Sequence, residues 1–176
     1  MSKLFFTADT HFGHDSIIRM CKRPFESVAS MDEGLIERWN SKVAPNDVVY
    51  HLGDVSFRAP RPVGTYLERL HGQIHLVIGN HDNREAIEAT GRLRSISDIK
   101  EIGWRGQRIV MCHYPMREWP GAWRGAWHLF GHVHGSLDSQ PLGYSLDVGI
   151  DSHGLMPLAV EEIAAIMATR DKHFGS

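Results

Sequence analysis

The sequence predicts an α/β fold in which two packed β-sheets are flanked by helices. Three observations support this prediction: short apolar, β-prone runs recur along the chain, helical patterns separate the early runs, and strand-like segments dominate the later part. The chain has 176 residues, of which 42% are hydrophobic and 23% charged, so it is long enough to bury a core without disulfides. We expect one domain over residues 1–176, with residues 170–176 forming a frayed tail.

The first half of the chain alternates predicted strands with predicted helices. Buried strands are expected at the short apolar runs Lys3–Ala8, Val48–Leu52 and Gln73–Ile78. Helices are expected where apolar residues recur at helical spacing, at Ser16–Cys21, Met31–Val43, Val63–Leu70 and Arg84–Thr90. The longest of these helices starts at a predicted capping box, in which Ser30 and Glu33 satisfy each other's backbone amides.

The second half is predicted to be mainly β-structure. Ser95–Ile102 and Gln107–Cys112 flank a Gly-Trp-Arg-Gly segment and predict a hairpin. Tyr114–Arg124 is rich in Trp, Arg, Pro and Gly, and we expect it to be a loop that lines a site. Further strands are expected at Trp127–Phe130 and Tyr144–Val148, and a short strand followed by a helix within Leu158–Thr169.

Composition and charge narrow the class of protein. The net charge of −2 gives no global basic field to attract nucleic acid. Cys21 and Cys112 have neither zinc-knuckle nor redox-pair spacing, so we expect reduced thiols, with Cys112 in the core. No segment has the length of a signal peptide or approaches the ~20 apolar residues of a membrane span, so we expect a cytoplasmic protein without a membrane partner. The 12 histidines are the compositional outlier and point to metal chemistry.

Five short polar segments each end an apolar run. They are Asp9-Thr10-His11, Gly53-Asp54, Gly79-Asn80-His81-Asp82, His113 and Gly131-His132-Val133-His134. Any one alone is more often a turn or a strand-end residue, but strand ends converge at one edge of an α/β sheet. Extended spacing would place Asp9 and His11 on one side of the chain, able to chelate one ion, and His132 and His134 repeat this spacing. Mixed oxygen and imidazole ligands favour manganese, iron or zinc over magnesium.

These motifs, in this order and spacing, resemble those of the calcineurin-like metallophosphoesterase superfamily. Val148-Gly149-Ile150-Asp151 also fits the resemblance. Thr10-His11-Phe12-Gly13-His14, followed by Arg23-Pro24-Phe25, is similar to a small single-domain bacterial and phage branch. The resemblance implies a four-layer αββα fold and a metal-dependent phosphoric ester hydrolase.

The resemblance also implies a role for each motif residue. It implies one ion held by Asp9, His11, Asp54 and His134, and a second held by Asp54, Asn80, His113 and His132. The ions would be divalent transition metals, manganese foremost, with iron, zinc, nickel and cobalt as alternatives, and they would share a hydroxide that attacks phosphorus. His81 would stabilise the transition state or protonate the leaving oxygen, and Asp82 would orient His81.

Residues that contact the substrate are predicted from charge and proximity to the motifs. The candidates are His14, Arg23, Arg58, Arg84 and Arg117, each weighed against an ordinary surface or structural role. Trp119 and Trp123 are expected either to stack on a base or to anchor the loop. The other histidines are expected to be structural or surface residues: His51, His71, His75, His128, His153 and His173.

We expect a phosphodiesterase acting on small or nucleotide-like diesters, because the motifs use nearly the whole chain and leave no room for a capping domain. A phosphomonoesterase is one alternative. A nuclease on the same fold is another, less favoured because the chain lacks a basic field. A metal-binding scaffold without turnover is the least favoured, because every motif residue is present. The sequence makes no prediction of the oligomeric state.

Overall fold

The computed structural model describes residues 2–171 and shows two β-sheets packed face to face. The strand order of the first sheet is β4-β3-β2-β1-β9. Strands β1 to β4 run parallel, and β9 is antiparallel to β1. The bounds are β1 (Leu4–Thr7), β2 (Val48–His51), β3 (Gln73–Val77), β4 (Ser95–Ser97) and β9 (Leu158–Ala159). Because β1 to β3 are neighbours and parallel, their carboxyl ends open onto one edge of the sandwich.

The second sheet has the order β5-β6-β7-β8. Its strands are β5 (Ile99–Trp104), β6 (Gln107–Cys112), β7 (Trp127–Phe130) and β8 (Ser145–Asp147). The predicted hairpin is confirmed: β5 and β6 are antiparallel, and Arg105 and Gly106 connect them with positive φ angles of 47° and 84°. Two central residues with positive φ make the kind of tight turn whose twist matches that of the strands. Strands β6, β7 and β8 are parallel.

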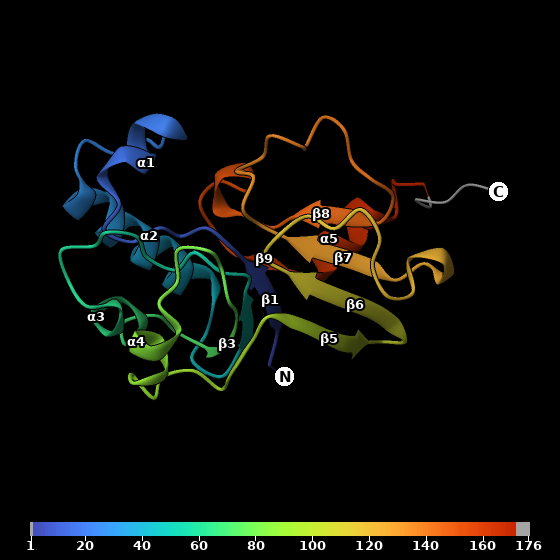
Figure 1. Cartoon of the computed structure of the whole chain (residues 1–176), viewed down its shortest axis with the longest axis horizontal. Coiled ribbons are helices and arrows are strands. Elements are labelled where there is room, and N and C mark those ends of the chain that lie inside the picture. Colours follow the sequence, from blue (N-terminus) through green and yellow to red (C-terminus); the bar gives the residue numbers. More distant parts are fainter. Residues whose placement is uncertain (1, 172–176) are drawn as a thin grey trace.

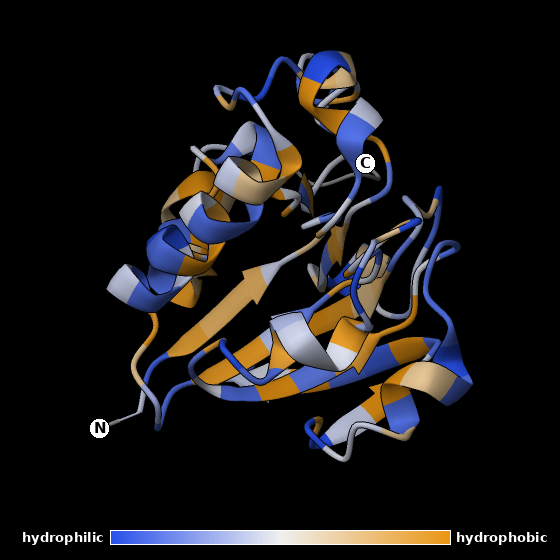
Figure 2. Ribbon diagram, turned by 90° about the vertical axis from the view of Figure 1, so that its left-hand side faces the viewer, coloured by the Kyte–Doolittle hydropathy of each residue, from blue (hydrophilic) through white to orange (hydrophobic). Residues whose placement is uncertain are grey.

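Helices flank the sheets, which confirms the predicted fold class (Figure 1). The helices are α1 (Asp15–Met20), α2 (Val28–Lys42), α3 (Val63–Leu67), α4 (Arg84–Glu88) and α5 (Val160–Met167), with 3-10 turns η1 (Ala122–Arg124) and η2 (Ile150–Ser152). In Figure 2 the helices are striped with hydrophobic and hydrophilic residues, as expected for elements with one buried face.

Alternate residues of the strands separate two cores. Phe5 of β1 packs with Trp39 of α2 in the core between the first sheet and helices α1 to α4. Its neighbour Phe6 packs with Ile109 and Leu129 in the core between the two sheets, which α5 joins through its own apolar side chains. This alternation follows from the two-residue period of a strand. On the outer face of the second sheet, Trp119 and η1 form a smaller cluster.

The predicted start of the longest helix is wrong by three residues. Helix α2 begins at Val28, and Ser27 is its N-cap. The amide of Ser30 donates to Ser27 Oγ at 3.2 Å, and the amide of Ser27 donates to Ser30 Oγ at 3.1 Å. Ser27 and Ser30 could each have served as the N-cap, and the helix uses Ser27. Strands β6 and β7 have the predicted bounds, and the other helices and strands, apart from the segment Ser95–Ile102, differ from prediction by at most three residues at either end.

The predicted strand Ser95–Ile102 is two strands in different sheets. Strand β4 pairs with β3 in the first sheet, and β5 pairs with β6 in the second. Asp98 lies between them, where the chain crosses from one sheet to the other. Both strands are partly exposed, so the hydropathy pattern of Ser95–Ile102 does not predict that the chain passes from one sheet to the other.

Three smaller expectations can be compared with the described residues. Cys112 lies on β6 as expected but is half-buried, not a full core residue. Within residues 2–171, no helix is long and apolar enough to cross a bilayer. Most of the predicted frayed tail, and His173 with it, falls outside the described residues.

Candidate metal centre

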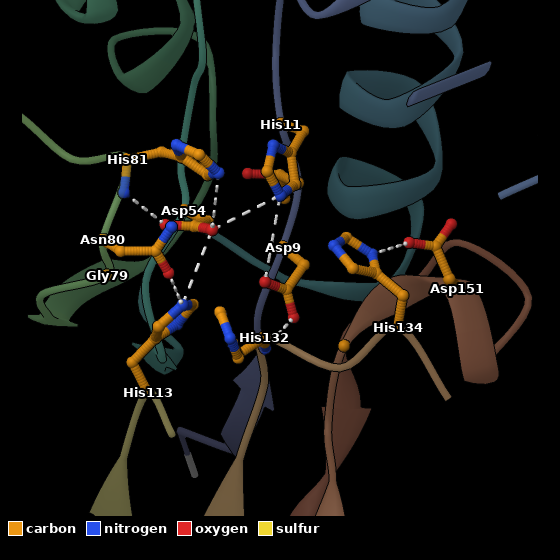
Figure 3. A network of polar contacts seen from close by, with 12 residues as sticks. Asp9, His11, Asp54, Gly79, Asn80, His81, His113, His132, His134 and Asp151 are labelled. Carbon is orange, nitrogen blue, oxygen red and sulfur yellow. Dashed lines mark hydrogen bonds and ion pairs between the residues drawn. The ribbon is translucent and has the colours of Figure 1, made fainter. Parts of the chain in front are cut away.

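The predicted site residues converge on one edge of the sandwich, at the carboxyl ends of β1, β2, β3, β6 and β7 (Figure 3). Backbone hydrogen bonds join the loops that carry them. The amide of Asp9 donates to the carbonyl of Gly53 at 3.0 Å, and that of His11 donates to the carbonyl of Asp54 at 3.0 Å. The amide of His132 donates to Asp9 Oδ2 at 2.9 Å, which ties the loop after β7 to the loop after β1.

The backbone at the site is left-handed, so the predicted extended spacing is wrong. The φ angles are 57° at Asp9, 49° at His11, 57° at Asp54, 72° at His132 and 48° at His134. The Asp9–His11 pair still gathers its donor atoms in one cluster, but His132 and His134 turn into two different clusters. Left-handed non-glycine residues are uncommon and gather where function requires a particular geometry.

The first cluster consists of Asp9, His11 and His134. One donor atom from each lies within 4.8 Å of the others. Asp9 Oδ1 and His11 Nε2 are buried and have no hydrogen-bond partner within residues 2–171. Buried polar atoms are nearly always paired, so two orphaned ligand atoms facing each other at 4.0 Å fit a cation between them.

The second cluster consists of Asp54, His113 and His132, again with donor atoms within 4.8 Å of one another. Asn80 joins it, because its Oδ1 lies 3.0 Å from His113 Nε2. His113 Nδ1 lies 2.7 Å from the carbonyl of Leu52, so Nδ1 donates there and Nε2 is the ring atom that faces the cluster.

Asp54 connects the two clusters. Its Oδ2 lies 3.5 Å from His11 Nε2 in the first cluster and 3.5 Å from His113 Nε2 in the second (Figure 3). Its Oδ1 accepts a hydrogen bond from the amide of His81 at 2.9 Å, which fixes the carboxylate between the two groups. This is the position that a bridging carboxylate would occupy.

Burial and hydrogen bonding shift the pKa values of the acidic and imidazole side chains at the site. Burial raises the pKa of the Asp9 carboxyl to about 7 and lowers the pKa of His11 to about 3. Burial also acts to raise the pKa of Asp54, but hydrogen bonds with the His113 ring and the His81 amide outweigh it and hold this pKa at about 2. Buried acids beside imidazole lone pairs form an environment that a divalent cation neutralises.

A buried network stands behind His134. Its Nδ1 donates to Asp151 Oδ2 at 2.7 Å. Burial lowers the pKa of His134, but this bond, together with the neighbouring Cys21 and Asp9, outweighs burial and raises the pKa to about 10. Arg23 donates to both Asp151 oxygens at 2.8 and 2.9 Å, and to the carbonyls of Thr10 and Asp9 at 2.8 Å each. Asp151 is the site residue that the sequence analysis did not assign, although its segment had been matched. A carboxylate behind a ligand histidine fixes the ring and its tautomer.

Two sequence-based roles need correction. The Arg23 side chain is 0% exposed, so it supports the centre from behind and does not face a substrate. The Asp82 carboxylate accepts from the backbone amides of Gly79, Asp54 and Val55, each at 2.8 Å. It therefore joins two ligand-bearing loops, and within residues 2–171 it makes no hydrogen bond to the His81 ring.

The remaining candidates divide between the rim of the site and the surface. His14 Nδ1 lies 3.3 Å from His11 Nδ1, and the guanidinium of Arg58 lies 5.1 Å from the centre of the Phe57 ring at the rim. Arg84 pairs with Asp98 on the surface at 2.7 Å.

The loop after His113 carries the other candidates. Arg117 lines a cavity of about 200 Å³ beside the segment that follows His134. Trp119 is buried and donates to the carbonyl of Ala126 at 2.8 Å, so it anchors this loop. Trp123 is 63% exposed and contacts Glu118.

Comparison with known proteins places this geometry in a family. Residues 3–143 match the model of the calcineurin-like phosphoesterase superfamily domain. The chain belongs to this superfamily. Membership supports a hydrolase of phosphoric esters, and the two donor clusters fit the metal dependence of such enzymes.

Relatives of this superfamily member span nearly its whole length. An uncharacterized protein of Methanocaldococcus jannaschii is 30% identical over 174 residues, covering 95% of this chain and 92% of that protein. The Gene 66 protein of Mycobacterium phage D29 is 27% identical over 189 residues, covering 90% of this chain and 93% of its own. The crystal structure of a protein of unknown function from Aquifex aeolicus shares the fold, with a TM-score of 0.75 and 23% identity over 94% of this chain and 100% of that one.

Proposed function

We propose that this superfamily member is a binuclear metal-dependent phosphodiesterase acting on small or nucleotide-like diesters. The observation that supports it best is the bridging position of Asp54, whose Oδ2 lies 3.5 Å from an imidazole of each donor cluster. Asp9, His11 and His134 would hold one ion, and Asn80, His113 and His132 the other, with Asp54 shared. The orphaned Asp9 Oδ1 and His11 Nε2 atoms support the first site. Manganese is the favoured metal because the donor set mixes imidazole with oxygen.

Two divalent ions bound there would lower the pKa of a shared water and neutralise charge on the phosphoryl oxygens. The protein's own residues supply the rest. His81 stands at the mouth with its side chain 33% exposed and its Nε2 4.0 Å from Asp54 Oδ2. From this place it can donate a proton or a hydrogen bond to the leaving oxygen. His14 and Arg58, at the same rim, offer further donors to the phosphoryl group.

The preference for a diester rests on the shape and charge of the mouth. Asn80, His81 and His132 are exposed, so the mouth leaves room for organic groups on both sides of a phosphorus atom. Arg23, one of the arginines predicted to contact the substrate, is buried and paired with Asp151. Within residues 2–171, the buried Arg23 thus adds no charge at the mouth to neutralise the second negative charge of a monoester dianion, and a diester carries only one charge.

The test combines metal analysis with a substrate panel. We expect the chelator-treated protein to take up about two manganese ions per chain, and to hydrolyse bis(p-nitrophenyl) phosphate faster than p-nitrophenyl phosphate. Asp54→Asn should lower the occupancy of both sites, because one carboxylate serves both. His81→Ala should keep normal metal content and lose about 10²–10⁴-fold in kcat.

His75→Ala is the matched control for the loss of a histidine. His75 lies on β3, and its Nδ1 bonds Ser95 Oγ at 2.8 Å away from both clusters, so activity should stay near wild type. Failure to bind manganese, or equal kcat for wild type and His81→Ala, would contradict the proposal. Faster turnover of the monoester would replace the phosphodiesterase with a phosphomonoesterase, and salt-sensitive cleavage of DNA would indicate a nuclease.

A further inference from the structure

We propose that Phe57 is a positioning residue that holds the His81 ring in its working orientation over the metal centre. The inference deepens the proposed function and rests on it, because it concerns the group that would protonate the leaving oxygen. It assigns to an apolar residue of the loop after β2 the orienting role that sequence analysis gave to Asp82.

The Phe57 ring lies between two histidines of the site rim. Its centroid is 3.9 Å from that of His81, at an interplanar angle of 45°. On another side it meets His14 edge to face, with centroids 4.8 Å apart. Both imidazoles also lie close to the ligand candidate His11, at centroid distances of 5.5 Å for His81 and 5.2 Å for His14. The phenyl ring therefore sets how the two outer histidines lie around the centre.

No hydrogen bond fixes the His81 ring within residues 2–171. The backbone of His81 is anchored, because its amide donates to Asp54 Oδ1 at 2.9 Å. The nearest acceptor for its ring is Asp54 Oδ2, at 4.0 Å, which is beyond hydrogen-bond distance. The Asp82 carboxylate accepts its hydrogen bonds from backbone amides and not from this ring. Of the two ring contacts that remain, Phe57 at 3.9 Å is closer than His11 at 5.5 Å, so packing against Phe57 is the contact best placed to select one orientation of this ring.

Phe57 is itself held by a docked pair of loops. The amide of Phe12 donates to the carbonyl of Val55 at 2.9 Å, and the amide of Phe57 donates to the carbonyl of Phe12 at 3.3 Å. The loops approach so closely that a Cβ on Gly13 would lie 2.4 Å from the Cβ of Ala59. The guanidinium of Arg58 lies over the Phe57 ring at 5.1 Å. A ring that is carried by hydrogen-bonded loops and contacted by both His14 and Arg58 can hold a neighbouring ring in turn.

The kinetic test is a double-mutant cycle with two leaving groups. Phe57→Leu should lower kcat by roughly 10–100-fold on a phenyl diester, and less on a p-nitrophenyl diester whose leaving oxygen needs little protonation. KM and manganese content should stay near wild type, and Phe57→Tyr should restore most of the activity. In a His81→Ala background, Phe57→Leu should have no further effect, because the group that it positions is gone.

Trp104→Leu is the matched control. Trp104 is a half-buried aromatic residue at the far end of the β5–β6 hairpin, packed on Trp127 with Arg105 over its ring at 4.9 Å. Its loss removes the same kind of packing far from the centre and should leave kcat unchanged. Equal losses on both leaving groups, additive effects in the cycle, or an equal loss in Trp104→Leu would overturn the inference.

A second readout is independent of activity. In the metal-free protein, a phenyl ring at 3.9 Å should displace the His81 ring-proton NMR signals through its ring current, and Phe57→Leu should return them to ordinary values. Assignment follows from their loss in His81→Ala. Undisplaced signals in the wild type would reject the role of Phe57 even in an active enzyme. Displaced signals in a protein that hydrolyses no ester would instead reject the proposed function.

Discussion

Replacing Arg23 with methionine tests how strongly the buried network supports the metal centre. The guanidinium is 0% exposed, its partner Asp151 is 6% exposed, and the pair is joined by two hydrogen bonds of 2.8 and 2.9 Å. Methionine would leave the Asp151 carboxylate without its main cation and two backbone carbonyls without donors. Removing one partner of a buried ion pair costs about 3–5 kcal/mol, and we expect Arg23→Met to lower the free energy of unfolding by this amount.

The assay is urea unfolding of the metal-free protein, with the free energy taken from midpoint and slope. Arg69→Met is the matched control, because Arg69 also binds a carboxylate through two nitrogens, with distances of 2.7 and 2.6 Å to Glu33. That pair is exposed to solvent, and its loss should leave stability close to wild type.

A further effect should appear on metal binding. With Arg23 gone, Asp151 loses its fixed position and no longer holds the His134 ring as firmly, so manganese affinity should fall by about 10–100-fold. Equal unfolding midpoints for Arg23→Met and Arg69→Met would refute the reasoning, since burial is the main difference between the two pairs.

Two more predictions concern pH and close packing. Burial lowers the pKa of His128 to about 4, so between pH ~6.5 and ~4 the unfolded chain binds more protons than the folded chain. As the pH falls through this range, the free energy of unfolding should decrease by about 1.4 kcal/mol per pH unit. His128→Asn should make this decrease shallower, and an unchanged pH dependence in urea titrations would contradict the assignment. A Cβ at position 131 would lie 2.5 Å from Ala8 Cβ and from Asp9 Oδ2, so Gly131→Ala should distort the first cluster and reduce manganese stoichiometry. Gly103→Ala, where a Cβ meets nothing within 4 Å, should keep the wild-type stoichiometry, and identical metal content in both variants would count against this packing argument.

The sequence was sufficient to predict the fold class and to predict that the polar segments lie at the ends of strands. Apolar runs that stop at Asp9, Asp54 and Asn80 announce strand ends, and parallel neighbouring strands bring such ends together. The order of the motifs was enough to indicate the family. These features are local in the chain, and pattern reading is strongest there.

The supporting residues were not readable from the sequence, because their roles depend on partners far along the chain. Arg23 is buried by Asp151, 128 residues away, while an arginine in a sequence is ordinarily read as a surface residue. Asp82 stands next to His81 but turns to the backbone of the loop after β2, 27 and 28 residues earlier. Phe57 has no motif of its own, and only the docking of two loops places it against His81.

The left-handed turns at Asp9, His11, Asp54, His132 and His134 have a consequence for how this chain tolerates change. Each holds a side-chain-bearing residue in a conformation that is unfavourable by about 1–2 kcal/mol and that glycine adopts freely. Glycine would relieve this cost, but at Asp9, Asp54 and His134 it would also remove the hydrogen bonds that tie the loops together. The same backbone strain that aims the donor side chains at the centre therefore lowers the stability of the loops that carry them.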